Sequence, residues 1–553
     1  MAKINTILLR LALVLAIITI FAGSAIQPGV LRAYGQQPYQ YSFPVFFNQA
    51  ASSTSSASTS YYVTTLNTGL MYNLGCELGT RDKNTPGPQD SVAVLAFGYP
   101  RCFAGGGYGA NLFGFGPATT GNIRTAVEQF ALGYYTCSGS DRVSNLVVGL
   151  GTSNYQGSNE PCETQEKATA HGTAWSGMVR DLNQWAINQG VIHQVQFFGA
   201  NDIELDWNTP AWSRAWVTGF DQVSGNLMLH FGDAAGCPYE NYPHWSCGTS
   251  NYPEWTPEDV WYVSYGAPSA LPLPLIYLTN GVHAKQWAYL SLYSVINHGY
   301  HMDFSGVFTQ WAACQQSGNC DSIDNTPQAA YQQLTYELSK WPITAQHLRW
   351  QTDIRWIMQN EAGGAQVFQD EQQGVERTHP TAERSADLSL ALQAADLSPE
   401  MRTSLESKQR TFQSLAEMVA LSRANPAEKD EPLLISPAPS LRGEFESGLI
   451  ENGEMPGIPY GARITTVWQS VVEEGYLQVG AGTSADDLQR GVLYLLLSAP
   501  DTTPIKSAQI LAPENCGPLT ITGQDGHLLK VQSANGCGLS LDLGSWELIA
   551  EPN

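Results

Sequence analysis

Between residues 61 and 360 the hydrophobic positions fall into short apolar runs, most of them bounded by Gly, Pro or Asp. Runs of this length with these borders are typical of buried β-strands. They predict strands at residues 91–97, 145–150, 191–198, 226–231, 260–265 and 272–278.

Helical patterns, with apolar side chains three and four positions apart, lie between or after these runs. They predict helices at residues 123–132, 164–189, 284–298 and 326–340. Strands that alternate with helices indicate parallel βα units, and the number of units fits an α/β fold with a TIM-like (β/α) barrel at residues 61–360, irregular or incomplete. A doubly wound open sheet is the alternative, but no G-x-G-x-x-G follows the first predicted strand to support a dinucleotide-binding version.

The pattern changes after residue 360. Residues 361–442 are charged and nearly free of aromatic side chains, and Ser398-Pro399 has the form of a helix start that leads to about Arg423. We expect a charged helical linker here. From residue 443 to 553 short alternating runs return, separated by turn signals such as Gln524-Asp525-Gly526, which predicts a small all-β module.

The amino-terminal residues have the form of an export signal. Lys3 and Arg10 supply positive charge, residues 11–22 are apolar, and Gly23-Ser24-Ala25 offers small residues for cleavage. An uncleaved anchor is the alternative, but the apolar run is short against the roughly 20 residues that span a bilayer. We expect a signal peptide at residues 1–25, a flexible lead-in at 26–60, and a secreted, extracellular protein with no membrane span after cleavage.

The cysteines fit an oxidising compartment. Their number is ten, and none forms a C-x-x-C pair of the kind that zinc sites use, so disulfides are the better interpretation. Sequence alone does not fix the connectivity, and pairing of neighbours along the chain is the working hypothesis. The pairs would be Cys76 with Cys102, Cys137 with Cys162, Cys237 with Cys247, Cys314 with Cys320, and Cys516 with Cys537.

The net charge of −23 argues against a nucleic-acid partner and against adhesion to anionic lipid. Proteins that bind a phosphate backbone need a surplus of Lys and Arg to displace its counterions, and this chain has 27 such residues against 50 acidic ones.

The strongest candidate chemistry follows the strand predicted at residues 191–198. Asp202, Glu204 and Asp206 occupy alternate positions, so in an extended chain they point the same way, about 6.5–7 Å apart from one to the next. Carboxylates so close repel one another when ionised, and one keeps its proton to higher pH. Glycosidic bond cleavage uses such a pair, so we expect Glu204 as the acid, Asp202 as nucleophile or base, and Asp206 in support. An acidic turn without function and a Ca²⁺ site are the alternatives.

A resemblance supports this interpretation. Gly-Ala-Asn-Asp-Ile-Glu at residues 199–204 resembles a signature in a family of secreted, largely uncharacterised bacterial proteins regarded as glycoside-hydrolase-like barrels. The likeness continues at residues 215–220, 230–237, 274–277 and 286–287, and implies a hydrolase-type TIM barrel. In one respect the chain departs from the pattern. Related barrels often have an Asp inside the first strand, where this chain has Ala96.

Aromatic side chains near the predicted strand ends are candidates for contact with a sugar, because aromatic rings pack against the apolar faces of sugar rings. The candidates for substrate binding are Asn201, Trp207, Tyr265, Tyr277 and Trp287. We expect no cofactor and no metal. The His298/His301/Asp303 pattern is weak for zinc, and no H-E-x-x-H or G-x-S-x-G motif is present.

The sequence therefore predicts a secreted glycoside-hydrolase-like protein that acts on a polysaccharide or glycoconjugate, with a carbohydrate or cell-wall glycan as its partner. The rival hypothesis is a non-catalytic extracellular protein that keeps the barrel as a binding or structural scaffold. Ala96 favours the rival, and the acids at residues 202–206 favour the enzyme.

Overall fold

A computed structural model describes residues 57–103, 106–113, 116–156, 162–239, 246–318, 320, 324–357, 378–424, 447–451, 455, 462–473, 475–484, 487–499 and 504–550. The predicted signal peptide, nearly all of the lead-in and both ends of the predicted linker lie outside the described residues.

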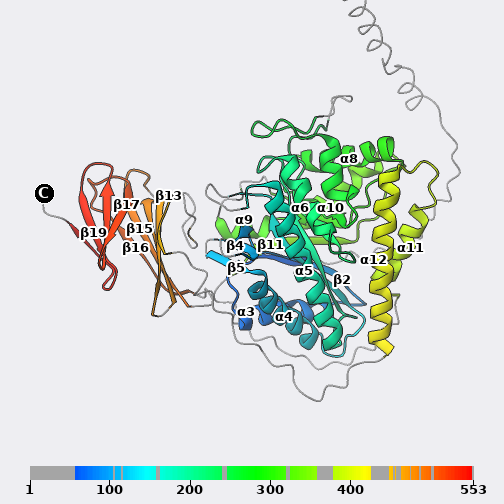
Figure 1. Cartoon of the computed structure of the whole chain (residues 1–553), viewed down its shortest axis with the longest axis horizontal. Coiled ribbons are helices and arrows are strands. Elements are labelled where there is room, and N and C mark those ends of the chain that lie inside the picture. Colours follow the sequence, from blue (N-terminus) through cyan, green and yellow to red (C-terminus); the bar gives the residue numbers. More distant parts are fainter. Residues whose placement is uncertain are drawn as a thin grey trace, which may run out of the picture. The chain divides into compact units, whose positions relative to one another are not determined.

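The centre of the fold is a sheet of eight parallel strands (Figure 1). Its order is β10-β11-β1-β2-β6-β7-β8-β9. Each strand therefore lies beside the sheet's next strand along the chain, except that β9 and β10 form the two edges, and β11 lies beside β1. The strands are β1 (Ser58–Tyr62), β2 (Asp90–Ala96), β6 (Asn145–Ser153), β7 (Val195–Asp202), β8 (Met228–His230), β9 (Ala270–Pro272), β10 (Gly306–Thr309) and β11 (Trp350–Trp356).

The sheet curls until its two edges nearly meet. Beyond β9, Leu275 forms a parallel bridge with Phe308 of β10. The Ile276 amide donates to the Phe308 carbonyl at 2.9 Å, and the Phe308 amide donates to the Pro274 carbonyl at 3.0 Å. The result is a nearly closed parallel barrel sheet, in which the carboxyl ends of all eight strands share one end.

Helices connect the strands, as the alternating pattern predicted. They are α3 (Thr68–Asn84), α4 (Thr120–Cys137), α5 (Gln165–Gln189), α6 (Pro210–Asp221), α7 (Pro257–Trp261), the π-helix η1 (Tyr262–Gly266), α8 (Val282–His298), α9 (Trp311–Ser317) and α10 (Pro327–Ser339). Threonine caps set several of the starts. Thr164, for example, accepts from the Lys167 amide at 3.3 Å, and Thr209 accepts from the Trp212 amide at 3.1 Å. The predictions for α4, α5, α8 and α10 are confirmed.

One predicted strand was wrong, and the strand predicted at residues 272–278 shares only Pro272 with β9. Residues 260–265 are helical, because Thr256 and Asp259 form a capping box with Pro257 at the first helical turn, and this start signal outweighs the β-rich composition that follows. Three strands were not predicted from the sequence. Strand β1 follows a Ser-rich segment, β10 is only four residues long, and β11 carries charged side chains at alternate positions. The run at 91–97 is consequently the second strand of the barrel, not the first.

Reciprocal glycines bring two pairs of helices into close contact. A Cβ on Gly75 of α3 would lie 1.9 Å from the Phe130 carbonyl oxygen of α4, and one on Gly133 of α4 would lie 1.9 Å from the Tyr72 carbonyl oxygen. The pair α5 and α6 repeats the arrangement. There the Cβ of Gly172 would meet Trp216 O at 2.1 Å, and that of Gly219 would meet Thr169 O at 2.0 Å. Only residues without a side chain allow the backbones so near.

A small antiparallel sheet follows β2 at the carboxyl end of the barrel. It consists of β3 (Tyr99–Cys102), β4 (Tyr108–Leu112) and β5 (Gly116–Thr119), in that order. The Cys102–Cys162 disulfide joins β3 to the segment that precedes α5. The loop between β2 and α4 is therefore a folded, cross-linked layer.

Five disulfides account for all ten cysteines. The predicted neighbour pairs Cys237–Cys247, Cys314–Cys320 and Cys516–Cys537 are confirmed. The other two predicted pairs are wrong, since Cys76 bonds Cys137 and Cys102 bonds Cys162. The packing of α3 against α4 brings Cys76 and Cys137 together, which spacing along the chain does not reveal. This number of disulfides fits a protein that matures in an oxidising, extracellular setting.

Two helices of the region predicted as a linker pack on the barrel. These are α11 (Pro380–Ala391) and α12 (Pro399–Ala424), which contact one another along their length. The buried Lys408 of α12 donates to the Tyr265 carbonyl and to Ser404 Oγ. The Phe412 ring lies 6.2 Å from that of Phe198 in β7. Helix α12 is therefore part of the barrel's hydrophobic core.

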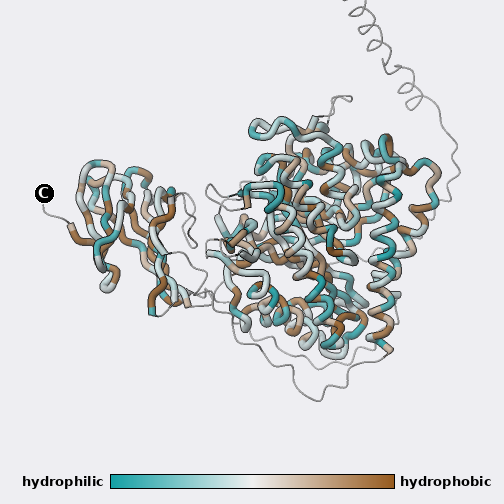
Figure 2. Tube along the Cα trace, in the orientation of Figure 1, coloured by the Kyte–Doolittle hydropathy of each residue, from teal (hydrophilic) through white to brown (hydrophobic). Residues whose placement is uncertain are grey.

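The C-terminal residues form two antiparallel sheets, as predicted. One contains β12 (Gly448–Glu451), β13 (Arg463–Val472), β14 (Gly475–Thr483), β15 (Gly491–Ser498) and β16 (Pro504–Leu511). The other contains β17 (Leu519–Asp525), β18 (Leu528–Ser533), β19 (Gly538–Asp542) and β20 (Glu547–Ala550). Side chains such as Val479, Leu493 and Leu541 are buried in a core of this region's own. Figure 2 shows hydrophobic residues recurring along these strands between hydrophilic ones.

Candidate active site

Strand β7 ends in the acidic segment that the sequence singled out. Asp202 is its last residue, and a turn at residues 205–207 follows. The predicted alternation of buried and exposed side chains continues beyond Asp202, where the strand ends. Ile203 and Leu205 are buried, Asp202 and Glu204 are partly exposed, and Asp206 is exposed. The three acids thus face the carboxyl end of the barrel.

Asn154, directly after β6, holds this segment in place. Its side chain donates to the Glu204 carbonyl at 2.9 Å and accepts from the Glu204 amide at 3.1 Å. Its own amide donates to the Asp202 carbonyl at 3.1 Å, and Asn208 donates to the Asn154 carbonyl at 2.9 Å. Because Asn154 is fully buried, the backbone of Glu204 is fixed from behind while its carboxyl group stays partly exposed. Sequence reasoning missed this residue.

Asp233, three residues beyond β8, is a further acid that the sequence analysis did not select. It is 2% exposed and accepts a hydrogen bond from the Ala235 amide at 2.9 Å. Its Oδ2 lies 3.8 Å from Nε2 of His283, near the start of α8. The available signal was its place after a buried apolar run, the same place that Asp202 occupies. Burial lowers the pKa of His283, and Asp233 opposes that shift.

The acids at this end raise one another's proton affinity. The pKa of Asp202 is raised well above its usual range, by burial first and by Asp233 second. Burial also raises the pKa of Glu204, and Asp202, Asp233 and Asp206 add to the shift. Asp233 shifts upward by burial, but His283 and the Ala235 amide oppose its shift. Of Asp202, Glu204 and Asp233, Asp233 is therefore the one with neighbouring groups, His283 and the Ala235 amide, that favour its anion.

Two tyrosines from other strands share this electrostatic environment. Burial raises the pKa of Tyr62, the last residue of β1, and Asp202, Glu204, Asp353 and Asp324 raise it further. The pKa of Tyr277, beyond β9, is raised by burial and then by Asp233, Glu204, Asp324 and Asp202. The Tyr277 ring packs edge-on against His283, with centroids 4.5 Å apart. These side chains come from β1, β7 and β11 and from the segments after β7, β8, β9 and α9. We call the set the acidic cluster, defined as Tyr62, Asp202, Glu204, Asp206, Asp233, Tyr277, Asp324 and Asp353.

Aromatic rings border the acidic cluster in two groups. Tyr62 contacts Phe113 and Trp356, with ring centroids 5.0 Å and 4.5 Å away. Tyr155 contacts Tyr99 at 5.5 Å and Trp207 at 6.0 Å. Tyr155 is 41% exposed, which is unusual for so large a ring. This second group follows β2, β6 and β7, and we call it the aromatic rim.

The predicted substrate-binding residues fall into two sets. Trp207 belongs to the aromatic rim and Tyr277 to the acidic cluster. Asn201, Trp287 and Tyr265 are fully buried. Trp287 packs against His230 with centroids 5.5 Å apart, and Tyr265 lies in η1, where its carbonyl accepts from Lys408. These three side chains are closed off from solvent.

Ala96 is the last residue of β2, paired in register with Tyr62 and Gly151, and it is buried. The barrel end therefore has a small apolar side chain at this strand. Its neighbours β1 and β6 supply no carboxylate to the group either, since Asp202 ends β7, Asp233 follows β8 and Asp353 lies in β11.

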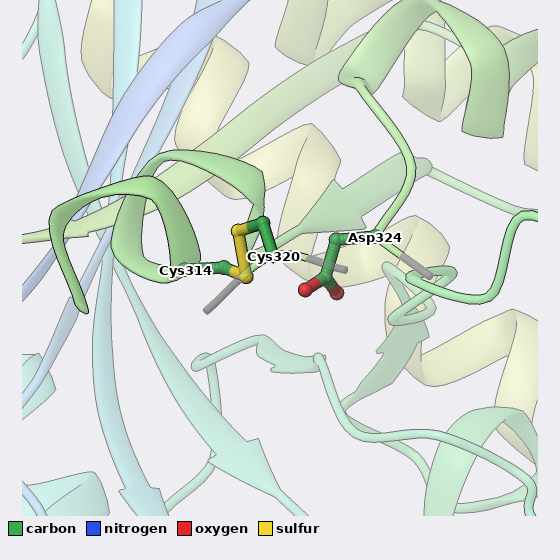
Figure 3. Close-up of side chains that lie close together, drawn as sticks. All are labelled: Cys314, Cys320 and Asp324. Atoms are coloured by element: carbon green, nitrogen blue, oxygen red, sulfur yellow. A yellow bond between two sulfur atoms is a disulfide. The ribbon is translucent and has the colours of Figure 1, made fainter. Parts of the chain in front are cut away.

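Among the described residues, one group of three His, Cys, Asp or Glu side chains lies close enough to share an ion, namely Cys314, Cys320 and Asp324 (Figure 3). The two sulfur atoms form a disulfide and offer no thiolate. The acids at residues 202–206 do not converge in this way. His298, from the weak zinc pattern, stacks on Trp261 at 3.5 Å and bonds Glu258 at 2.9 Å, which is a structural arrangement.

Comparisons with known proteins do not assign this chain to a family. No family model matches the chain, and no curated protein matches it. Among solved structures, the carboxyl transferase domain of Rhizobium etli pyruvate carboxylase with pyruvate and biocytin is similar at 8% identity, with a TM-score of 0.20 over 83% of this chain and 89% of that chain. The same domain with pyruvate gives a TM-score of 0.19. These scores are too low to carry an argument.

In the part of the chain that the structure describes, every helix is too short or too polar to cross a bilayer.

Proposed function

We propose that this chain is a secreted glycoside-hydrolase-like protein on a TIM-like barrel, acting on a polysaccharide or glycoconjugate by carboxylate acid/base catalysis. The observation that carries the proposal is the gathering of Asp202, Glu204 and Asp233 at one end of a parallel barrel sheet, each with a raised pKa. Active sites of such barrels form at the carboxyl ends of the strands.

The chemistry requires one protonated and one ionised carboxyl group. Glu204 suits the acid, because burial and three neighbouring carboxylates keep its proton bound while its side chain stays partly exposed. It would protonate the leaving glycosidic oxygen.

The partner carboxylate attacks the sugar or activates water. Asp202 is the partner that the sequence predicts, and Asp233 joins it as a second candidate because His283 and the Ala235 amide favour its anion. Replacing each by Asn separates the two. If Asp202 is the partner, Asp202→Asn loses nearly all turnover and Asp233→Asn mainly shifts the pH profile through the pKa of Glu204. If Asp233 is the partner, the two effects are exchanged.

The aromatic rim supports sugar binding. Tyr155 and Trp207 present ring surface beside the acids, and the apolar face of a pyranose packs on such rings. The five disulfides fit work outside the cytoplasm.

The deciding experiment measures hydrolysis of a broad panel of polysaccharides and cell-wall glycans by the mature protein and by Glu204→Gln. We expect the variant to lose activity by about 100-fold or more, the contribution of general acid catalysis, while its melting temperature stays at or above that of the wild type. Exposed Glu417→Gln on α12 is the matched control and keeps full activity.

Equal hydrolysis by the wild type and Glu204→Gln would remove Glu204 from the chemistry. If no glycan in the panel is cleaved, the barrel is instead a binding or structural scaffold, and a glycan pull-down becomes the next measurement.

A further inference from the structure

A row of side chains crosses the carboxyl ends of four barrel strands. Its members are partners in register on β6, β7, β8 and β9, namely Thr152, Asn201, His230 and Pro272. Side chains alternate between the two faces of a strand, and a Cβ on Gly199, two positions before Asn201, would lie 2.4 Å from the Phe220 ring of α6. The row therefore points away from the barrel interior and toward the helices.

Helix α8 closes part of this row with Trp287, whose ring packs edge-on against that of His230. Asn201, His230 and Trp287 are each 0% exposed. Within the part of the chain that the structure describes, five of their polar atoms form no hydrogen bond: Nδ2 and Oδ1 of Asn201, both ring nitrogens of His230, and Nε1 of Trp287. Thr152 differs, because its hydroxyl donates to the Gly98 carbonyl at 3.1 Å.

Five unpartnered polar atoms on three neighbouring side chains are a strong sign of a bound molecule. A buried donor or acceptor without a partner costs about 1–3 kcal/mol, and native proteins contain few of them. Nearly all such atoms are paired once ordered water is counted.

The five atoms need a ligand that both donates and accepts hydrogen bonds. The Trp287 indole and the Asn201 amide nitrogen are donors, whereas Asn201 Oδ1 is an acceptor. His230 offers one of each, since burial lowers its pKa to about 3 and its ring is therefore neutral near neutral pH. An anion would not satisfy the acceptors, and a metal cation would not satisfy the donors. Water satisfies both, and it is the smallest ligand for a place closed to solvent.

We propose that ordered water is bound inside the protein between β7, β8 and α8, where it bridges Asn201, His230 and Trp287. Buried water of this kind makes about three hydrogen bonds to otherwise unpaired groups and is costly to remove. Asn201 directly precedes Asp202, and Asp233 follows His230 by three residues. The water thus ties together the two strand ends that lead to these acids. This inference does not depend on the proposed hydrolysis.

A high-resolution crystal structure of the mature protein tests the site directly. We expect at least one water oxygen within about 3.2 Å of polar atoms from two of the three residues. The equally buried His171 is the control in the same map. Its ring nitrogens already bond the Gly109 carbonyl at 2.6 Å and Trp216 Nε1 at 2.9 Å, so no water should lie beside them. The proposal is overturned if Asn201 and His230 bond each other directly, or if no water lies within reach of the three side chains.

Thermal unfolding of variants is an independent test. His230→Phe keeps a ring of similar size but leaves the water and Asn201 short of a partner, so the unfolding midpoint should fall by about 2 °C or more. Asn201→Leu should have a similar effect. The double variant removes both polar walls and with them the need for water, so its loss should be clearly smaller than the sum of the two.

The opposite results would contradict the proposal. If the side chains are unpartnered and bind no water, apolar replacements should leave the midpoint unchanged or raise it. Strictly additive losses would show that no shared water couples Asn201 to His230. Should a variant fail to fold, the map of the wild-type protein still decides.

Discussion

Asp202 sits in an environment that resists its ionisation. Its Oδ1 is buried without a hydrogen-bond partner, and Asp233 lies near enough to repel a second negative charge. In the folded protein it therefore keeps its proton to higher pH than in the unfolded chain. Above the unfolded pKa the native state binds more protons, so the free energy of unfolding falls as pH rises through the interval between the two values.

Asp202→Asn should remove this dependence. At about pH 3, below the ordinary aspartate pKa of 3.8, the carboxyl group is mostly protonated in both states, and variant and wild type should be about equally stable. At about pH 7 the variant should be more stable by about 1 kcal/mol, a gain often seen when a strained site is relieved. Denaturant unfolding at both pH values measures it, with Glu417→Gln as control. A difference of the same size at both pH values would contradict the argument.

At the scale of residues, the sequence predicted Asp202, Glu204 and Asp206 because their alternation is visible in a single segment. Asp233 and Asn154 escaped because each lies near them only through the pairing of separate strands. Tyr62 escaped because it comes from β1, which β2 and β6 separate from β7. Trp287 and Tyr265 were selected by type and nearness to strands, but in the structure both are buried, and a single sequence does not say which face of a helix or strand an aromatic residue occupies.

At the scale of elements, two glycines of helix α5 can be compared with one another. Gly172 meets the backbone of α6, whereas a Cβ on Gly177 would have nothing within 4 Å. Gly172→Ala should push the helices apart and cost about 2–3 kcal/mol, as overpacking does. Gly177→Ala should be neutral or stabilising by up to about 1 kcal/mol through helix propensity. Thermal unfolding of the two variants tests this, and similar effects would show that the α5–α6 contact is not tight.

Most elements could be predicted from periodicity and caps, since helices such as α5 and strands such as β6 and β7 carry their signals locally. The segment 260–265 could not, because its apolar, β-branched and aromatic composition fits a strand, and a capping box outside the run decides for a helix. Short strands such as β10 owe their existence to pairing with neighbours, which a single sequence does not show.

At the scale of the whole molecule, Lys408 joins α12 to the barrel. Burial lowers its pKa to about 7, and Asp221 and Asp303 only partly oppose that shift. Since an unfolded lysine titrates near 10.4, the unfolded chain binds more protons between about pH 7 and pH 10. The stability of the wild type relative to Lys408→Met should therefore rise with pH across this interval, by up to about 1.4 kcal/mol per pH unit.

Denaturant unfolding of both proteins at about pH 7, 8.5 and 10 measures that difference. Lys408→Met keeps the length of the side chain, so a constant offset between the two proteins reports lost hydrogen bonds and packing. A difference that stays flat from pH 7 to pH 10 would show that the ammonium is not buried against Tyr265.

The two disulfides that neighbour pairing did not predict are interleaved, since Cys102 lies between Cys76 and Cys137, and Cys137 lies between Cys102 and Cys162. A chain that crosses a membrane amino end first presents Cys76 and Cys102 to the oxidising side before either native partner has emerged. Any bond formed between these two thiols must be reopened before α3 can be joined to α4. If the protein is exported in this way and that bond forms, its maturation includes a step of thiol exchange, which takes seconds to hours.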